Sequence, residues 1–142
     1  MTRSVIFAYM ASILFCGNAF AQNKITVEVK NILSEEGVIY VGFYKPDEDF
    51  PNHDAKHIKR RVKPSKGKVE LAVSDLPPGT YAVAVLHDIN DNDKLEKNFL
   101  GFPTEPYGFS KNIHHTFSAP TFDECKFTLA DKPVTLSIEL KQ

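Results

Sequence analysis

The chain has 142 residues, 42% of them apolar and 25% charged, which is an ordinary composition for one folded globular domain and excludes a disordered chain. Its 17 Lys and Arg residues nearly balance its 18 Asp and Glu residues, for a formal net charge of −1. A general electrostatic attraction to nucleic acid is therefore excluded.

Residues 1–21 have the order of a secretory signal peptide. Arg3 supplies a positive start, residues 5–15 form an apolar run, and a small-x-small triplet ends at Ala21. The apolar run is shorter than the ~20 residues that a membrane-spanning helix needs. The sequence therefore predicts export to the periplasm or the medium, cleavage after Ala21, and a mature chain from Gln22 with no transmembrane segment.

The two cysteines bear on the form of the exported chain. Cys16 offers a lipoprotein as the alternative, but Phe15 before it is bulkier than lipoprotein processing favours. Cleavage after residue 21 removes Arg3 and no acid, so the net charge becomes 16 − 18 = −2. Cys125 is then the one cysteine left, which excludes an internal disulfide. We expect it to be a buried core thiol, because no neighbouring residue in the sequence could activate it.

Residues 22–142 are expected to form a single domain made almost entirely of strands. Six segments have either the alternation of a half-buried strand or the doubly apolar character of a central one. These segments are residues 24–32, 37–44, 67–76, 80–88, 125–129 and 133–140. Turn residues separate them, so the sequence predicts an all-β sandwich of about seven strands with one long ordered loop. Its expected core contains Val27, Val41, Leu71, Val83, Val85, Leu136 and Ile138.

Residues 45–68 interrupt the strand pattern with three prolines and a basic run. A short helix is expected around residues 55–62. The seven Lys and Arg residues between positions 56 and 68 predict a solvated face, with a surface for an anionic polymer or lipid headgroup as the alternative.

The long loop at residues 87–112 contains a candidate cation site. Oxygen-bearing side chains recur at short intervals, and in a tightly wound loop such groups can converge on a hard cation. The candidate calcium ligands are Asp88, Asn90, Asn92, Lys94 through its carbonyl, and Glu96. The alternative is a loop of Asx-turns, in which Asp and Asn side chains bond to their own backbone.

The same loop contains candidate ligand-binding residues. Its aromatic rings either pack over one end of the sandwich or remain open to a sugar or peptide. His87 is expected to be a hydrogen-bonded structural residue, and a zinc or copper site with His114 and His115 is the alternative. The candidates for ligand binding are His87, Glu105, Tyr107 and Phe109.

Four motifs closely resemble the bacterial exported family called domain of unknown function 2141. They are "LPPGTYA" at residues 76–82, "HDINDN" at 87–92, "LGFPTEPYGFSKN" at 100–112 and "APTF" at 119–122. The family usually has glycine where this chain has Asp91 and Asp93, and Asp tolerates positive φ better than most residues. The resemblance implies an immunoglobulin-like or prealbumin-like sandwich, and it implies no established activity because the family is uncharacterised.

Two classes of function fit the sequence. The first is a binding module of the cell envelope, whose loop end presents a site for a small ligand, a glycan or an envelope protein. The second is a structural or accessory domain with no ligand beyond a stabilising cation. A pocket lined by Tyr107, Phe109 and His87 would favour binding, and a filled loop end would favour the structural role. No nucleophile or second carboxylate has a readable partnership with Glu105, so an enzyme is not expected.

Overall fold

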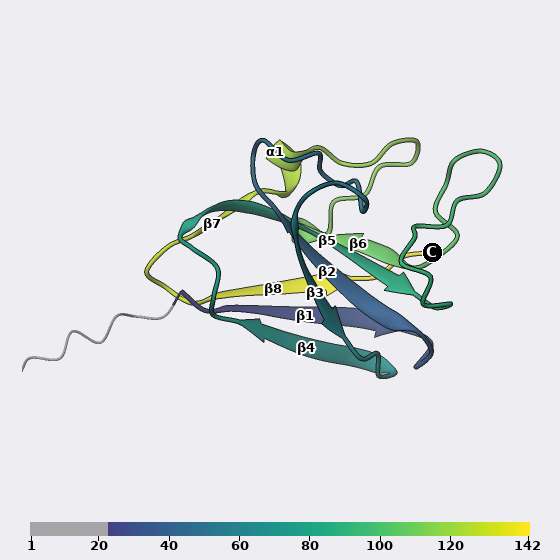
Figure 1. The fold of residues 1–142 in the computed structure, drawn as a ribbon, viewed down its shortest axis with the longest axis horizontal. Helices are drawn as coiled ribbons and strands as arrows, with labels where there is room; N and C mark the ends of the chain where they lie inside the picture. Colours follow the sequence, from purple (N-terminus) through teal and green to yellow (C-terminus); the bar gives the residue numbers. More distant parts are fainter. Residues whose placement is uncertain (1–22) are drawn as a thin grey trace, which may run out of the picture.

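The computed structural model describes residues 23–142 as two packed β-sheets, drawn in Figure 1. The expected signal peptide lies outside these residues. The smaller sheet has the order β4-β1-β8, with β1 paired antiparallel to β4 and parallel to β8. Its strands are β1 (Ile25–Ile32), β4 (Gly67–Val73) and β8 (Val134–Glu139).

The larger sheet has the order β3-β2-β5-β6, and β7 pairs with the start of β5. Its strands are β2 (Val38–Tyr44), β3 (Ile58–Val62), β5 (Gly79–Asp88), β6 (Tyr107–Phe109) and β7 (Phe127–Leu129). The predicted all-β sandwich is thus confirmed, with eight strands where about seven were expected.

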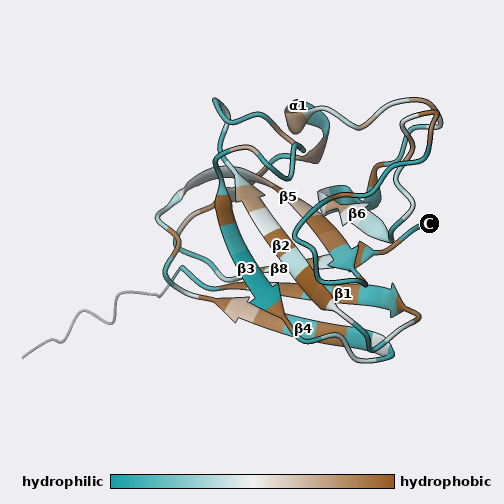
Figure 2. Ribbon diagram, turned by 45° about the vertical axis from the view of Figure 1, so that its right-hand side comes forward, coloured by the Kyte–Doolittle hydropathy of each residue, from teal (hydrophilic) through white to brown (hydrophobic). Residues whose placement is uncertain are grey.

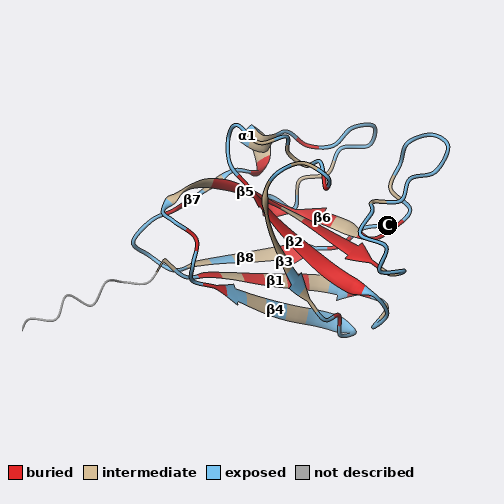
Figure 3. Ribbon diagram, in the orientation of Figure 1, coloured by how far each residue is buried: buried red, intermediate tan, exposed pale blue. Residues whose placement is uncertain are grey.

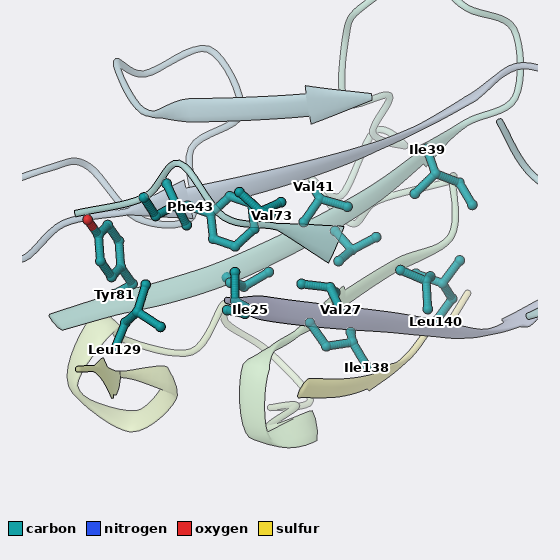
Figure 4. Close-up of a cluster of buried hydrophobic side chains, with 14 of the residues drawn as sticks. Ile25, Val27, Ile39, Val41, Phe43, Val73, Tyr81, Leu129, Ile138 and Leu140 are labelled. Carbon is teal, nitrogen blue, oxygen red and sulfur yellow. The ribbon is translucent and has the colours of Figure 1, made fainter. Parts of the chain in front are cut away.

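The core lies between the two sheets, where apolar side chains of both layers meet (Figure 4). Alternation along β1 sends Ile25, Val27 and Val29 inward, and all three are fully buried. Hydropathy changes from residue to residue along β1, as Figure 2 shows. Five of the seven predicted core residues are buried, namely Val27, Val41, Val83, Val85 and Ile138. Leu71 and Leu136 are half-buried and pack against this core.

The larger sheet is covered on both faces at its centre. Every residue of β2 is buried, and β5 is buried at seven of its ten positions (Figure 3). The smaller sheet covers one face, and long connections gather on the opposite side of the larger sheet (Figure 1). This second cover explains why the sequences of β2 and β5 are apolar on both faces.

The helix expected around residues 55–62 is wrong, because Ile58–Val62 forms β3. This strand pairs with β2, with Ile58 opposite Phe43 and Val62 opposite Ile39. Ile58 and Val62 pack against the core, so their β-branched side chains gain more from the sheet edge than from a helix. Pro64 follows the strand.

The segment after β6 closes the outer side. It contains the short helix η1 (Ser110–Asn112) and the one-turn helix α1 (Phe122–Cys125), which begins with a capping box between Thr121 and Glu124. Cys125 is fully buried, as predicted, and burial raises the pKa of its thiol to about 11. Within residues 23–142, no helix is long and apolar enough to cross a membrane.

Candidate functional site

A cavity of about 520 Å³ lies on the outer side of the larger sheet, under the long connections. Gly42 of β2 and Ala84 of β5 lie opposite each other in the sheet and line it with little side-chain bulk. The other lining residues come mainly from three separate segments, residues 49–57, 95–103 and 114–120. Residues far apart in the sequence therefore build one concave site.

The β2–β3 connection supplies an aromatic wall. The Tyr44 hydroxyl donates a hydrogen bond to the Asn52 carbonyl at 3.0 Å, which holds this connection over β2. The Phe50 ring meets the Tyr44 ring edge-on at 5.2 Å, and the His57 ring stacks on it at 4.1 Å. Burial is the main cause that raises the pKa of Tyr44 well above its ordinary value, so this hydroxyl remains a neutral donor.

A second part of the lining, which meets the first where Phe109 contacts Phe50, combines two predicted residues with one histidine. Tyr107 and Phe109 both line the cavity, and Phe109 is buried. The His114 ring lies 6.0 Å from the Tyr107 ring and 5.9 Å from the Phe109 ring. Burial is the main cause that lowers the pKa of His114, which therefore remains neutral beside these rings.

Four of the five histidines line the cavity. They are His53, His57, His114 and His115. The structure places His87 elsewhere, fully buried at the end of β5, where its Nε2–H donates to the Glu36 carbonyl at 2.9 Å. His87 is thus the hydrogen-bonded structural residue that the sequence suggested, and it does not line the cavity.

Glu105 also lies away from the cavity, and it fixes the base of the long loop. Its side chain is buried, and Oε1 accepts a hydrogen bond from the Ile89 amide at 3.0 Å. The other oxygen, Oε2, is buried without a protein partner. Burial is the main cause that raises the pKa of Glu105.

The candidate calcium ligands come together in the loop and bond largely to one another. Buried Asp88 accepts hydrogen bonds from the amides of Asn92, at 3.2 Å, and Asp93, at 2.7 Å. The Asn90 and Asn92 side-chain amides both donate to Glu96 Oε1, at 2.8 and 2.9 Å. The Lys94 amide donates to Asn92 Oδ1 at 3.0 Å. The bonds to the backbone amides of Asn92, Asp93 and Lys94 are of the kind that the Asx-turn alternative predicts, whereas those to Glu96 join side chains.

A metal centre with three side-chain ligands is not preformed in the part of the chain that the structure describes. Among residues 23–142, no three His, Cys, Asp or Glu side chains form a group that could hold a metal ion. His115 points its Nε2 at Glu124, 2.9 Å away, and His87 lies in another part of the fold. The zinc or copper alternative with His87, His114 and His115 therefore has no geometric support.

The mouth of the cavity has exposed apolar side chains. Leu100, Phe102 and Phe117 line the cavity and remain exposed, Phe117 at 86%. Phe99, beside Leu100 in the chain, is 94% exposed. The loop aromatics are thus divided: Phe109 packs inside, whereas Phe99 and Phe102 are open to solvent.

Sequence reasoning missed most of one wall. The wall from the β2–β3 connection includes Phe50, His53 and His57, in a segment whose prolines and charges resemble a solvated linker. The available signal was the pair of histidines four residues apart among aromatic residues. The covered outer face of β2, with Tyr40 and Tyr44, was the second signal.

The fold and site together define an all-β sandwich that encloses an aromatic, histidine-rich cavity between one sheet and its long connections. The model of the family described as "Uncharacterized protein conserved in bacteria (DUF2141)" matches residues 27–137. The chain belongs to this family, as its four motifs predicted. The comparisons found no match among curated proteins and none among solved structures.

Proposed function

We propose that the mature chain is an exported, non-enzymatic binding module of the bacterial cell envelope, and that the cavity on the larger sheet takes a small ligand or a glycan unit. The supporting observation is the cavity itself. Its volume of about 520 Å³ lies within the ~300–1,000 Å³ that is typical of small-molecule sites. Export rests on the predicted signal peptide at residues 1–21.

The lining suits a ligand with a flat or apolar body. Tyr44, Phe50, Tyr107 and Phe109 contribute aromatic surface from both walls. Such rings pack against sugar faces, aromatic rings and aliphatic groups alike, whereas directional polar groups select among them. The neutral imidazole of His57 supplies a polar group of this kind.

The test is a ligand-observed NMR screen of small aromatic compounds and glycan fragments with the mature chain. Ala84→Phe fills the base of the cavity, and Ala72→Phe places the same ring on exposed β4 in the other sheet. We expect ligands that bind the wild type and Ala72→Phe but not Ala84→Phe. Ligands that bind Ala84→Phe equally well would show that the cavity is not the site.

The structural or accessory role is the second candidate, and one observation favours it. The base of the long loop is filled and internally bonded, with Asp88, His87 and Glu105 all buried. In this role the loop supports one end of the sandwich, and a bound cation stabilises it. A screen that returns no cavity ligand at millimolar concentration would favour this role over the binding module.

We also propose that calcium binds the loop at residues 88–96. Glu96 already meets the side chains of Asn90 and Asn92. Rotating the Asn90 amide by half a turn would present its oxygen, together with the Glu96 carboxylate, to a cation. With Asp88 and the Lys94 carbonyl nearby, the donors are oxygen atoms, which calcium prefers.

A further inference from the structure

We propose that His53 and His57 form an open binding site for a divalent transition-metal ion, of the zinc or copper class, in the wall of the cavity. The two residues stand four apart in the β2–β3 connection. Their ring centroids are 6.3 Å apart, over the outer side of β2. His53 meets the Tyr40 ring edge-on at 5.1 Å, and His57 stacks on Tyr44 at 4.1 Å.

The hydrogen bond of His57 fixes which of its nitrogens carries the proton. Its Nδ1 lies 2.7 Å from the Ala55 carbonyl oxygen. A carbonyl oxygen only accepts, so Nδ1 must carry the proton, and Nε2 is left with a free lone pair. Burial is the main cause that lowers the pKa of His57, which favours this neutral form.

Gly42 leaves that lone pair uncovered. A Cβ atom at Gly42 would lie 2.9 Å from His57 Nε2, so any other residue there would press against the nitrogen. Gly42 and His57 both line the cavity, and Nε2 has no protein hydrogen bond in the structure. The absent side chain therefore keeps Nε2 close to the sheet and open to a small ion.

In His53 the proton is on the other ring nitrogen, Nε2, which leaves the lone pair on Nδ1. Its Nε2 has two charged neighbours, Asp93 Oδ1 at 3.0 Å and Lys59 Nζ at 3.4 Å. The carboxylate is the shorter contact and can only accept, so Nε2 carries the proton and Nδ1 has the lone pair. Lys59 Nζ lies 3.8 Å from the same Asp93 oxygen and helps to keep the carboxylate ionised. The hydrogen bond from His53 is the main cause that lowers the pKa of Asp93.

Both histidines thus make the hydrogen bond that metal-ligating histidines usually make with the nitrogen that does not hold the metal. A ligating imidazole usually donates its other N–H to a carboxylate or a backbone carbonyl, which orients the ring and raises its basicity. His53 uses the Asp93 carboxylate in this way, and His57 uses the Ala55 carbonyl. The other two cavity histidines differ: both nitrogens of His114 are buried without a partner, and His115 is exposed.

The chemistry of the pair selects the ion. Imidazole nitrogen suits zinc, copper and nickel, whereas magnesium and calcium prefer oxygen. No third His, Cys, Asp or Glu side chain completes a metal site among residues 23–142. The remaining coordination positions would face the cavity, where water or a donor atom of a bound molecule can fill them, as in open zinc sites.

The test is isothermal titration of the untagged mature chain with zinc and copper salts near neutral pH, with a magnesium salt as the negative control. We expect one zinc or copper ion per chain and no magnesium binding. His53→Gln and His57→Gln should each weaken binding by at least about tenfold, and Asp93→Asn by about 10- to 100-fold. His115→Gln is the matched control, a cavity histidine outside the pair, and should bind as the wild type does.

Electron paramagnetic resonance of the copper-loaded wild type tests the proposal even if a variant fails to fold. Copper bound to the pair should show two nitrogen couplings in electron paramagnetic resonance, and His53→Gln should leave one. The proposal would be overturned if the wild type bound no zinc or copper, or if bound copper showed no nitrogen coupling. It would also be overturned if His115→Gln lost as much metal affinity as His57→Gln. This proposal does not depend on a small-molecule ligand: metal binding without any hit in the screen would support it while leaving the cavity ligand unsupported.

Discussion

At the residue scale, two aspartates of the long loop adopt a backbone conformation that favours glycine. Asp91 and Asp93 have φ values of 53° and 56°, in the left-handed region that favours glycine. Asp is among the residues that tolerate this region, as expected from the sequence. Asp91 also accepts from Arg61 at 3.0 Å, and Asp93 from His53. These two side chains thus make contacts between the long loop and the β2–β3 side of the molecule that a glycine could not make.

Glu105 gives a prediction about pH. Burial raises its pKa, so the folded state holds this proton more tightly than the unfolded state. The resulting stability is fully present below the ordinary pKa of a glutamate and is lost as the pH rises through the raised folded value. Glu105→Gln keeps an oxygen for the Ile89 amide and removes the buried charge. We therefore expect the variant to be the more stable protein at neutral pH, by on the order of 1 kcal/mol.

The measurement is urea unfolding of the wild type and Glu105→Gln at several pH values between about 4 and 8. The difference in unfolding free energy should grow in favour of the variant as the pH rises, and it should be smallest at the acid end. A difference that stays constant across this range would mean that Glu105 does not titrate with a raised pKa in the folded protein.

At the element scale, the long loop carries the calcium prediction. Glu96 is exposed, so Glu96→Gln should cost little stability without calcium but should remove a charged ligand. With a Kd in the ~10⁻⁴–10⁻³ M class of extracellular modules, calcium at a hundredfold excess should stabilise the wild type by about 2.7 kcal/mol. Glu96→Gln should lose most of this increment. Glu36→Gln, an exposed acid outside the loop, should keep it.

Thermal melts with calcium and with chelator, on these three proteins, provide the check. Asp88 is a poorer position for this test than Glu96. Its carboxylate holds two backbone amides, so its removal should destabilise the loop whether calcium is present or not. Equal melting of the wild type in calcium and in chelator would leave residues 88–96 as a self-bonded loop without a cation.

Six of the eight strands were predictable because each lies in a segment with its own periodicity or apolar run, whereas β3 and β6 were missed. β1 alternates and β2 is apolar throughout, and both lie where the pattern placed them. The helix expected at residues 55–62 was wrong because pairing with β2, which is a tertiary contact, decides the structure of Ile58–Val62. The local sequence pattern does not reveal which neighbouring strand an edge strand will pair with.

The cavity was predictable only in part, for the same reason. Tyr107 and Phe109 stand out in the long loop, and both line the cavity. His53 and His57 belong to a connection that becomes a wall only because the Tyr44 hydroxyl holds it over the sheet. His87 and Glu105 were named as candidates for ligand binding, with a structural role expected for His87, and the fold buries both. Their burial follows from the closure of the loop, which spacing along the chain does not reveal.

At the scale of the whole molecule, the two sheets are joined beyond their shared core. The Tyr107 and Lys141 backbones exchange two hydrogen bonds, of 2.9 and 2.8 Å, so the segment after β8 bonds to β6 of the other sheet. This joint lies next to the cavity wall that contains Tyr107. The position of that wall therefore depends on the packing between the sheets.

Gly108 allows this close approach, and it gives the last prediction. A Cβ atom at Gly108 would lie 2.7 Å from the Ile138 side chain and 2.9 Å from the Glu139 carbonyl oxygen of β8. Backbone cannot move away as easily as a side chain, so Gly108→Ala should force β6 from β8 and destabilise the fold by about 1–3 kcal/mol.

Gly79→Ala is the matched control, because its Cβ atom would meet only Tyr81 at 3.5 Å, an ordinary contact. Urea unfolding of both variants measures the effect, and any cavity ligand found in the screen should bind Gly108→Ala more weakly than Gly79→Ala. Equal stability of the two variants would mean that the sheets can separate at β6 without cost, and that the joint does not position the cavity wall.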